Sequence, residues 1–161
     1  MKKLLTLVCA ALLTCGAMWA QTEQGVAAVG GKILYGSGIE NMGLGAHFQY
    51  NVWDQIRGEV STNFFFKKHH SNWMDVNVNG HYLIPVYQDK VILYPLAGLN
   101  YTMVNYKIDG HNDEENHVGL NVGGGAEYLI DDHFSAAFEY RHTIIRKVDQ
   151  GVLSLGLSYR F

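Results

Sequence analysis

The sequence has little proline, little cysteine and no long apolar run. Two of its 161 residues are proline, and both cysteines lie within the first fifteen positions. Scarce proline permits long hydrogen-bonded strands, because proline cannot donate to a sheet ladder. If the first segment is removed on export, no thiol remains, which excludes disulfides and thiolate chemistry in the mature chain. No stretch reaches the roughly 20 apolar residues that a membrane-spanning helix needs.

The first twenty residues have the order of a secretory signal peptide. Lys2 and Lys3 are positive, residues 4–13 are apolar, and small residues follow as far as Ala20. We expect cleavage after Ala20, which leaves residues 21–161 as a single mature domain. Cys15 offers an alternative, since residues 12–15 loosely resemble a lipoprotein signal in which that cysteine would be lipidated. Thr14 is an unfavourable residue immediately before such a cysteine.

Positive charge is also scarce after the signal peptide. Removing its two lysines leaves 12 − 2 = 10 basic residues against 15 acidic ones, a net charge of 10 − 15 = −5. Phosphate binding requires a basic surface, so this balance argues against nucleic acid as a partner.

Apolar and polar residues alternate with period two through almost the whole remaining chain. The pattern predicts an all-β fold, an eight-stranded antiparallel up-and-down transmembrane β-barrel. We expect strands at residues 25–35, 43–53, 56–66, 73–84, 92–106, 117–130, 134–146 and 151–161. The connections are short at 53–55, 86–90 and 131–133, and longer at 36–42, 67–72 and 107–116, while 147–150 is short. Pro95 falls inside the fifth strand, where we expect regular pairing to begin only near Tyr94.

A closed soluble barrel of the lipocalin type would also alternate, with its apolar face inward. Three features favour the membrane: strands of ten residues or more, glycine mixed with charge on the polar face, and aromatic residues at the strand ends. Aromatics toward the short connections are Tyr50, Trp53, Tyr82, Tyr128, Phe134 and Phe161. Those toward the longer connections are Tyr35, Phe64, Trp73, Tyr101 and Tyr106.

The segment GLNVGGGAEYLIDDHFSAAFEYRHT (119–143) and the terminal LGLSYRF (155–161) resemble the small outer-membrane β-barrel domain of Gram-negative bacteria. That porin-like family includes outer membrane protein X and the opacity-type surface proteins. The resemblance implies a location in the bacterial cell outer membrane after export. It also implies that the outer-membrane assembly machinery reads the last strand as an address. The residues that carry over are Leu153, Leu155, Leu157, Tyr159 and Phe161. The alternation reaches the final residue. We expect that it does so because the last strand pairs with the first and closes the sheet.

The inward face collects charges of both signs, which we interpret as a structural ionic network that fills the lumen. Its residues are Lys32, Arg57, Glu59, Asp75, Glu127, Glu139, Arg141 and Arg160. A proton or ion path is the alternative, but the interior of an eight-stranded barrel is only wide enough for side chains.

Histidines in two outer loops raise the question of a metal. His69 and His70 lie in one loop, and His111 and His117 flank the acidic stretch of another. Their spacing matches no established metal site, so we expect neither a metal nor a cofactor.

An enzyme is the second class of function to weigh. Tyr140, Arg141 and His142 look similar to the catalytic strand of outer-membrane lipid A deacylases, but Ile144 stands where that family has its serine, two residues after the histidine. A nucleophile without a placed base is not a site. We therefore predict a non-enzymatic, monomeric barrel with a structural or adhesion-like role. Its expected partners are membrane lipid, lipopolysaccharide and a host or cell-surface ligand that contacts the extracellular loops.

Overall fold

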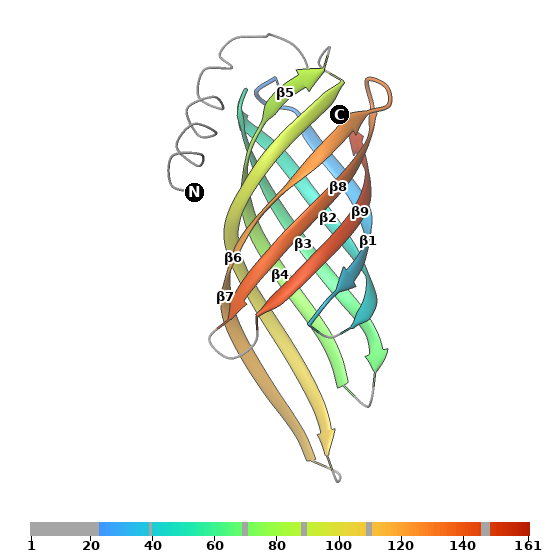
Figure 1. Cartoon of the computed structure of the whole chain (residues 1–161), viewed down its shortest axis with the longest axis vertical. Helices are drawn as coiled ribbons and strands as arrows, with labels where there is room; N and C mark the ends of the chain where they lie inside the picture. The colour runs from blue at the N-terminus through green and yellow to red at the C-terminus, as the bar shows by residue number, and fades with distance from the viewer. Residues whose placement is uncertain (1–22, 39, 69–70, 88–89, 109–110, 146–148) are drawn as a thin grey trace, which may run out of the picture.

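The computed structural model describes residues 23–38, 40–68, 71–87, 90–108, 111–145 and 149–161, and in these it is all-β (Figure 1). The predicted signal peptide, residues 1–20, lies outside the described residues. Among the described residues, no helix is long and apolar enough to cross a membrane. The strands are β1 (Ala27–Gly36), β2 (Asn41–Trp53), β3 (Ile56–Lys68), β4 (Ser71–Tyr82), β5 (Ile84–Tyr87), β6 (Val91–Ile108), β7 (His111–Leu129), β8 (Phe134–Ile145) and β9 (Gln150–Arg160).

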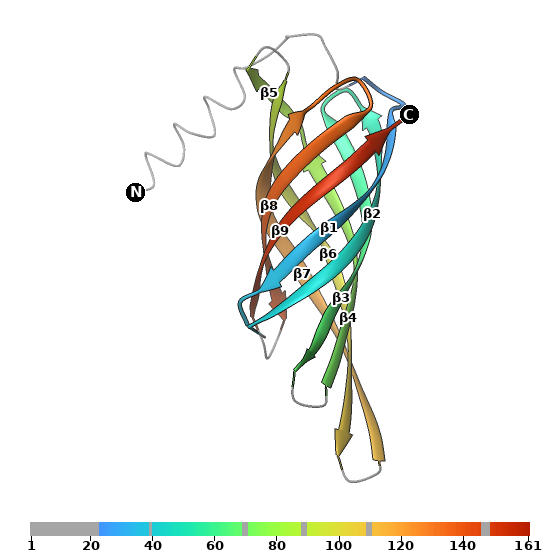
Figure 2. The same ribbon diagram turned by 90° about the vertical axis from the view of Figure 1, so that its right-hand side faces the viewer.

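The strands form one closed antiparallel sheet. Its order is β4-β3-β2-β1-β9-β8-β7-β6-β5, and an additional β4–β6 pairing joins the two sides. Because β4 and β5 both pair with β6, they act as one strand interrupted at Leu83. Counted in this way the barrel has eight strands, which confirms the predicted fold class. Figures 1 and 2 show the strands inclined to the long axis, with the tight turns at one end.

Closure occurs where the first and last strands meet. β1 pairs with β9 from Ala28↔Arg160 to Gly36↔Val152. Beyond this ladder the Ala27 amide donates to the Phe161 carbonyl at 3.2 Å, and the Phe161 amide donates to the Ala27 carbonyl at 2.9 Å. The last residue is thus hydrogen-bonded into the sheet, as its place in the alternation predicts.

The predicted start of pairing in the fifth strand is wrong. Regular pairing of β6 with β7 begins at Val91↔Tyr128 and includes Pro95, rather than starting near Tyr94. The β4–β6 ladder ends at His81↔Leu96 and the β5–β6 ladder resumes at Ile84↔Leu93. Pro95 therefore lies opposite the break between β4 and β5, where a strand residue needs no amide for that neighbour.

The longer connections are shorter than the sequence indicates. The pattern predicts loops at residues 67–72 and 107–116, yet Lys68 pairs with Ser71 and Ile108 with His111. A strand that leaves the membrane has polar surroundings on both faces, so it no longer needs apolar residues at every second position. The period-two signal disappears there although the backbone ladder continues.

The outer surface of the barrel is apolar and its interior is polar. Large side chains such as Leu155 and Leu157 are 60% exposed, whereas Asn63 and Asn77 are fully buried. This is the reverse of a soluble lipocalin-like barrel, and it is the arrangement of a barrel surrounded by lipid.

Aromatic side chains lie on the outer surface near both ends, with one correction. Trp73, which the sequence groups with the aromatic residues at the longer-connection end as a feature that favours the membrane, does not lie on the lipid-facing surface, because it packs against the interior cluster of Leu34, Phe65 and Val152. It pairs with the buried Phe65 and lies two residues from Asp75 on the same face of β4. The side chain of Tyr106 lies outside the described residues.

Candidate functional site: the polar interior of the barrel

The half of the interior nearer the tight turns holds a charged cluster. We define it as Lys32, Arg57, Glu59, His81, Tyr94, Glu127 and Glu139. Arg57 Nη1 on β3 lies 2.5 Å from Glu127 Oε2 on β7, across the lumen. Lys32 Nζ lies 3.0 Å from Glu59 Oε1, and Gln49 Nε2 donates to Glu59 Oε2 at 2.9 Å. Hydrogen-bonded pairing of this kind offsets the cost of burying charge.

Tyr94 lies at the centre of the charged cluster. Its ring stacks on His81 with centroids 4.7 Å apart, and the Arg57 guanidinium carbon lies 5.1 Å from the same ring centroid. The hydroxyl donates to Glu139 Oε2 at 3.2 Å. Gly125 makes this position possible, because a Cβ there would overlap the end of the Tyr94 ring.

The half of the interior nearer the longer connections holds an amide cluster instead. Its members are Asn63, Asp75, Asn77, Asn79, Asn100, Thr102, Asn121 and Thr143. Asn77 Oδ1 accepts hydrogen bonds from Asn100 and Asn121 at 2.8 and 2.9 Å. Asp75 Oδ1 accepts from the amides of Asn63 and Asn77, both at 2.6 Å. Among the described residues, one ion pair reaches this half: Arg141 Nη2 lies 3.7 Å from Asp75 Oδ2.

An apolar cluster lies toward each end of this polar interior. Leu83, Ile92, Leu96 and Leu129 pack with Tyr94 toward the tight turns. Leu34, Phe65 and Val152 pack with Trp73 toward the longer connections. The polar groups are therefore enclosed between apolar side chains, which leaves little room for a continuous water path.

Seven of the eight residues predicted for the ionic network are at most 6% exposed in the interior: Lys32, Arg57, Glu59, Asp75, Glu127, Glu139 and Arg141. Arg160 is half-buried at the tight-turn end. There it lines a cavity of about 10 Å³ together with Arg57 and Glu127. The structure divides the predicted network between the two clusters, because Asp75 and Arg141 pair apart from the others.

The residues predicted as an assembly signal share the lipid-facing side of the chain's end. Each is more than 40% exposed: Leu153, Leu155, Leu157, Tyr159 and Phe161. Tyr159 contacts the ring of Phe134 edge to face, with centroids 5.3 Å apart.

The histidines that suggested a metal or an enzyme do not come together in the described part of the barrel. His69 and His70 lie outside the described residues, as does the side chain of His111. His142 is half-buried on β8, while Thr143 is buried and donates to Asn121 Oδ1 at 2.8 Å. Ile144 is 48% exposed. The side chains that follow His142 thus provide no nucleophile beside it.

Tyr94 and His81 are the central residues that the sequence did not single out as functional. A signal existed for Tyr94, since Gly123, Gly124 and Gly125 on the neighbouring strand leave space for a large inward side chain. His81 shares the polar face of β4 with Asp75, Asn77 and Asn79. Its contacts come from β3 and β6, and alternation along one strand does not reveal them.

The fold is shared with solved outer-membrane barrels. The N-terminal barrel domain of Pseudomonas aeruginosa OprF has a TM-score of 0.70 and 16% identity, covering 86% of this chain and 98% of that one. For Neisserial surface protein A the TM-score is 0.68 and the sequence identity is 16%, and the match covers 84% of this chain and 96% of that one. For Ail of Yersinia pestis, the attachment invasion locus protein, the TM-score is 0.65 and the sequence identity is 17%. That match covers 86% of this chain and 99% of the other. At these identities the likeness concerns the fold alone.

Among curated proteins, no sequence is significantly similar to this chain. A family model, by contrast, matches nearly all of it. The match extends over residues 6–161 and has the description outer membrane protein beta-barrel domain. With the closed sheet, the apolar outer surface and the polar interior, this match places the protein in the bacterial outer membrane. The chain belongs to the outer membrane protein β-barrel domain family.

Proposed function

We propose that this protein is a non-enzymatic surface-interaction barrel, whose outer hairpins bind molecules outside the cell while the barrel anchors them. The observation that carries the proposal is the length of the β6–β7 hairpin. It continues past the other strands as a two-stranded arm (Figures 1 and 2). Short turns in these barrels face the periplasm and longer connections face outward, so the arm would extend from the cell.

The arm offers a strand edge within the described residues. β7 pairs with β6 as far as Ile108↔His111, but its pairing with β8 stops at Gly119↔Ile145. Among the described residues, positions 111–116 therefore have a neighbouring strand on one side only, over a length of about 20 Å. Unpaired backbone groups on a strand edge can receive a strand from a partner.

The charge of the outer segments supports two kinds of contact. Residues 111–117 include Asp113, Glu114 and Glu115, which would favour a basic partner. Lys67 and Lys68 on another hairpin would favour phosphate groups of lipopolysaccharide. A neighbour of the same fold, Ail, has been crystallised in complex with the heparin analogue sucrose octasulfate.

We infer that the protein acts as a monomer, because the closed sheet leaves no strand edge at membrane depth.

The test is to shorten the arm. Replacing residues 104–115 with a two-residue turn, so that Met103 and Asn116 stay paired beside it, should abolish binding of expressing bacteria to immobilised host cells or matrix, while the barrel still folds. The unheated and heated gel bands of the variant should differ as they do in the wild type. Binding that survives in the folded, shortened variant would refute the interaction role of the arm.

A lipid A-modifying enzyme is the alternative function. It would require a nucleophile next to His142 on the lipid-facing side, and the burial of Thr143 weighs against this. We expect the lipid A acylation pattern to be unchanged when the protein is expressed, as measured by mass spectrometry. An altered pattern that is lost in His142→Ala would establish the enzyme instead.

We further infer that the last strand serves as the address for the outer-membrane assembly machinery. Its five lipid-facing residues, from Leu153 to Phe161, present a continuous apolar row. Deleting Phe161 should reduce the amount of barrel in isolated outer membranes several-fold. Tyr128→Ala removes an outward aromatic at the same end of the barrel and should have little effect on that amount.

A further inference from the structure

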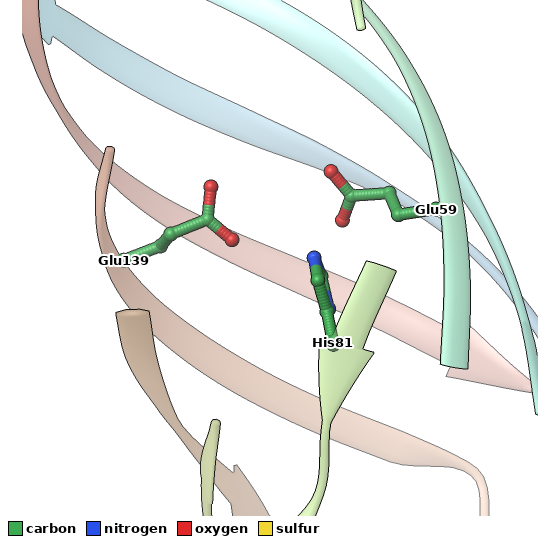
Figure 3. A group of neighbouring side chains, drawn as sticks. All are labelled: Glu59, His81 and Glu139. Atoms are coloured by element: carbon green, nitrogen blue, oxygen red, sulfur yellow. The ribbon is translucent and has the colours of Figure 1, made fainter. Parts of the chain in front are cut away.

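Three buried side chains from three strands converge inside the charged cluster. Glu59 lies on β3, His81 on β4 and Glu139 on β8, and one ligand atom from each lies within 4.8 Å of the other two. They are 2%, 1% and 5% exposed. Figure 3 shows the two carboxylates and the imidazole pointing toward one another. This convergence is independent of the loop histidines considered from the sequence.

The ion pairs of the interior leave one acid of this site, Glu139, without a base at ion-pair distance. Three buried bases pair with three buried acids: Lys32 with Glu59, Arg57 with Glu127 and Arg141 with Asp75. The fourth buried acid, Glu139, accepts a hydrogen bond from the Tyr94 hydroxyl. Among the described residues, Glu139 is thus the buried acid that is not matched by a base of its own. A buried carboxylate requires a compensating positive charge.

The imidazole adds a second and independent observation. His81 Nε2 is buried and has no hydrogen-bond partner among the described groups. An unsatisfied buried polar atom is costly, so native structures rarely retain one without a reason. In Figure 3 the ring is oriented so that a nitrogen faces the space between the two carboxylates.

We propose that Glu59, His81 and Glu139 form a binding site for a divalent transition-metal ion, with zinc the best match. Two carboxylate oxygens and one imidazole nitrogen are ligands that zinc accepts, and three protein ligands leave a fourth position for water. Ligand atoms on a tetrahedral zinc lie about 3.4 Å apart. Side-chain rotation has to shorten separations of up to 4.8 Å by about 1.4 Å.

The contact of Arg57 with His81 disfavours metal binding at this site, and it therefore provides a further prediction. Its Nε donates to His81 Nδ1 at 3.3 Å, so the neutral imidazole carries its proton on Nε2. A metal on Nε2 displaces that proton, and Nδ1–H then needs an acceptor where the guanidinium stands. Arg57→Gln provides an amide oxygen there, and it should bind the ion more tightly than the wild type.

The experiment is titration of Zn²⁺ alone into the folded mature barrel in detergent. The background carries His69→Gln, His70→Gln, His111→Gln and His117→Gln, which removes the outer-loop histidines as competing ligands. We expect one zinc per barrel by equilibrium dialysis. Glu139→Gln and His81→Gln should each weaken binding at least about tenfold, since even partners of metal ligands contribute that much. The matched control is Asp75→Asn, a buried carboxylate six residues from His81 along β4, about 20 Å away, which should bind as the background does.

Two outcomes would overturn the proposal. One is the absence of saturable one-to-one binding in the background without loop histidines, although the wild type binds. The other is zinc binding that persists in the folded Glu139→Gln and His81→Gln variants. X-ray absorption of the zinc-loaded background provides a readout that needs no interior variant. One imidazole with oxygen ligands supports the site, and several imidazoles refute it.

Discussion

The two halves of the barrel interior satisfy buried polar groups in different ways. The charged cluster does so with ion pairs across the lumen, such as Arg57 with Glu127 at 2.5 Å. The amide cluster does so with neutral hydrogen bonds, such as Asn121 to Asn77 at 2.9 Å. A charge that loses its partner costs far more than an amide that loses one of several. We therefore expect the half nearer the tight turns to dominate stability and the amide half to tolerate change.

The largest effect should come from breaking the ion pair across the lumen. Arg57→Met leaves Glu127 buried without its partner and removes the cation over Tyr94, so unfolding should become easier by about 3–5 kcal/mol. Urea unfolding in lipid vesicles, followed by tryptophan fluorescence, measures the change. Adding Glu127→Gln to the same chain should recover a large part of the loss. A loss below about 1 kcal/mol in Arg57→Met would contradict the importance of the charged cluster.

A smaller effect in the same half should follow from displacing Tyr94. Gly125→Ala places a methyl group against the Tyr94 ring and the Phe138 carbonyl oxygen, and overpacking of this kind costs about 1–3 kcal/mol. Gly80→Ala is the matched control, since a Cβ there would meet the Ala97 carbonyl oxygen at 3.8 Å, an ordinary contact. Equal destabilisation of the two variants in urea would show that Tyr94 is not held against Gly125.

In the amide half, removing one hydroxyl should have a modest effect. Thr143→Val deletes the hydrogen bond to Asn121 Oδ1 and keeps the side-chain shape, while Asn121 retains its bonds to Asn77 and Asn79. The expected loss is about 1 kcal/mol in the same unfolding assay. A loss as large as that of Arg57→Met would remove the distinction between the two halves.

The smallest effect concerns an exposed acid outside the membrane. Hydrogen bonds from the His133 and Phe134 amides hold the pKa of Asp131 below its ordinary value of 3.8. Its contribution to stability is therefore complete above pH 3.8 and is lost as pH falls through the lower folded-state pKa. The difference in stability between the wild type and Asp131→Asn should shrink as pH is lowered from about 5 toward about 2. A constant difference across that range would contradict this role of the turn.

The charged residues of the interior could be predicted from the sequence, but their pairing could not. Alternation along each strand is enough to assign Arg57, Glu59 and Glu127 to the inward face. It does not indicate that Arg57 on β3 meets Glu127 on β7, because strands that are not neighbours come together only when the barrel closes. For the same reason, the convergence of Glu59, His81 and Glu139 appears only in the folded chain.

Errors in the sequence-based prediction arise where the period-two pattern loses its meaning. Lys68 and Ser71 pair beyond the apolar part of their strands, where both faces are polar. Trp73 is aromatic, which favours the lipid surface, although its place two residues from Asp75 puts it inside. Its residue type favours the lipid-facing side, but the alternation of faces along β4 places it on the inward side with Asp75.

The resemblance of residues 119–143 and 155–161 to a known family implied the location in the outer membrane. By itself, the pattern of the sequence determined the fold class, the number of strands and the outward apolar face. These depend on the alternation of residues along each strand, which is a local property. The tertiary structure alone decided which charges pair, how Tyr94 is enclosed by His81, Arg57 and Gly125, and how far the β6–β7 arm extends. These depend on strand register and on contacts across the lumen, since residues far apart in the chain become neighbours only when the sheet closes on itself.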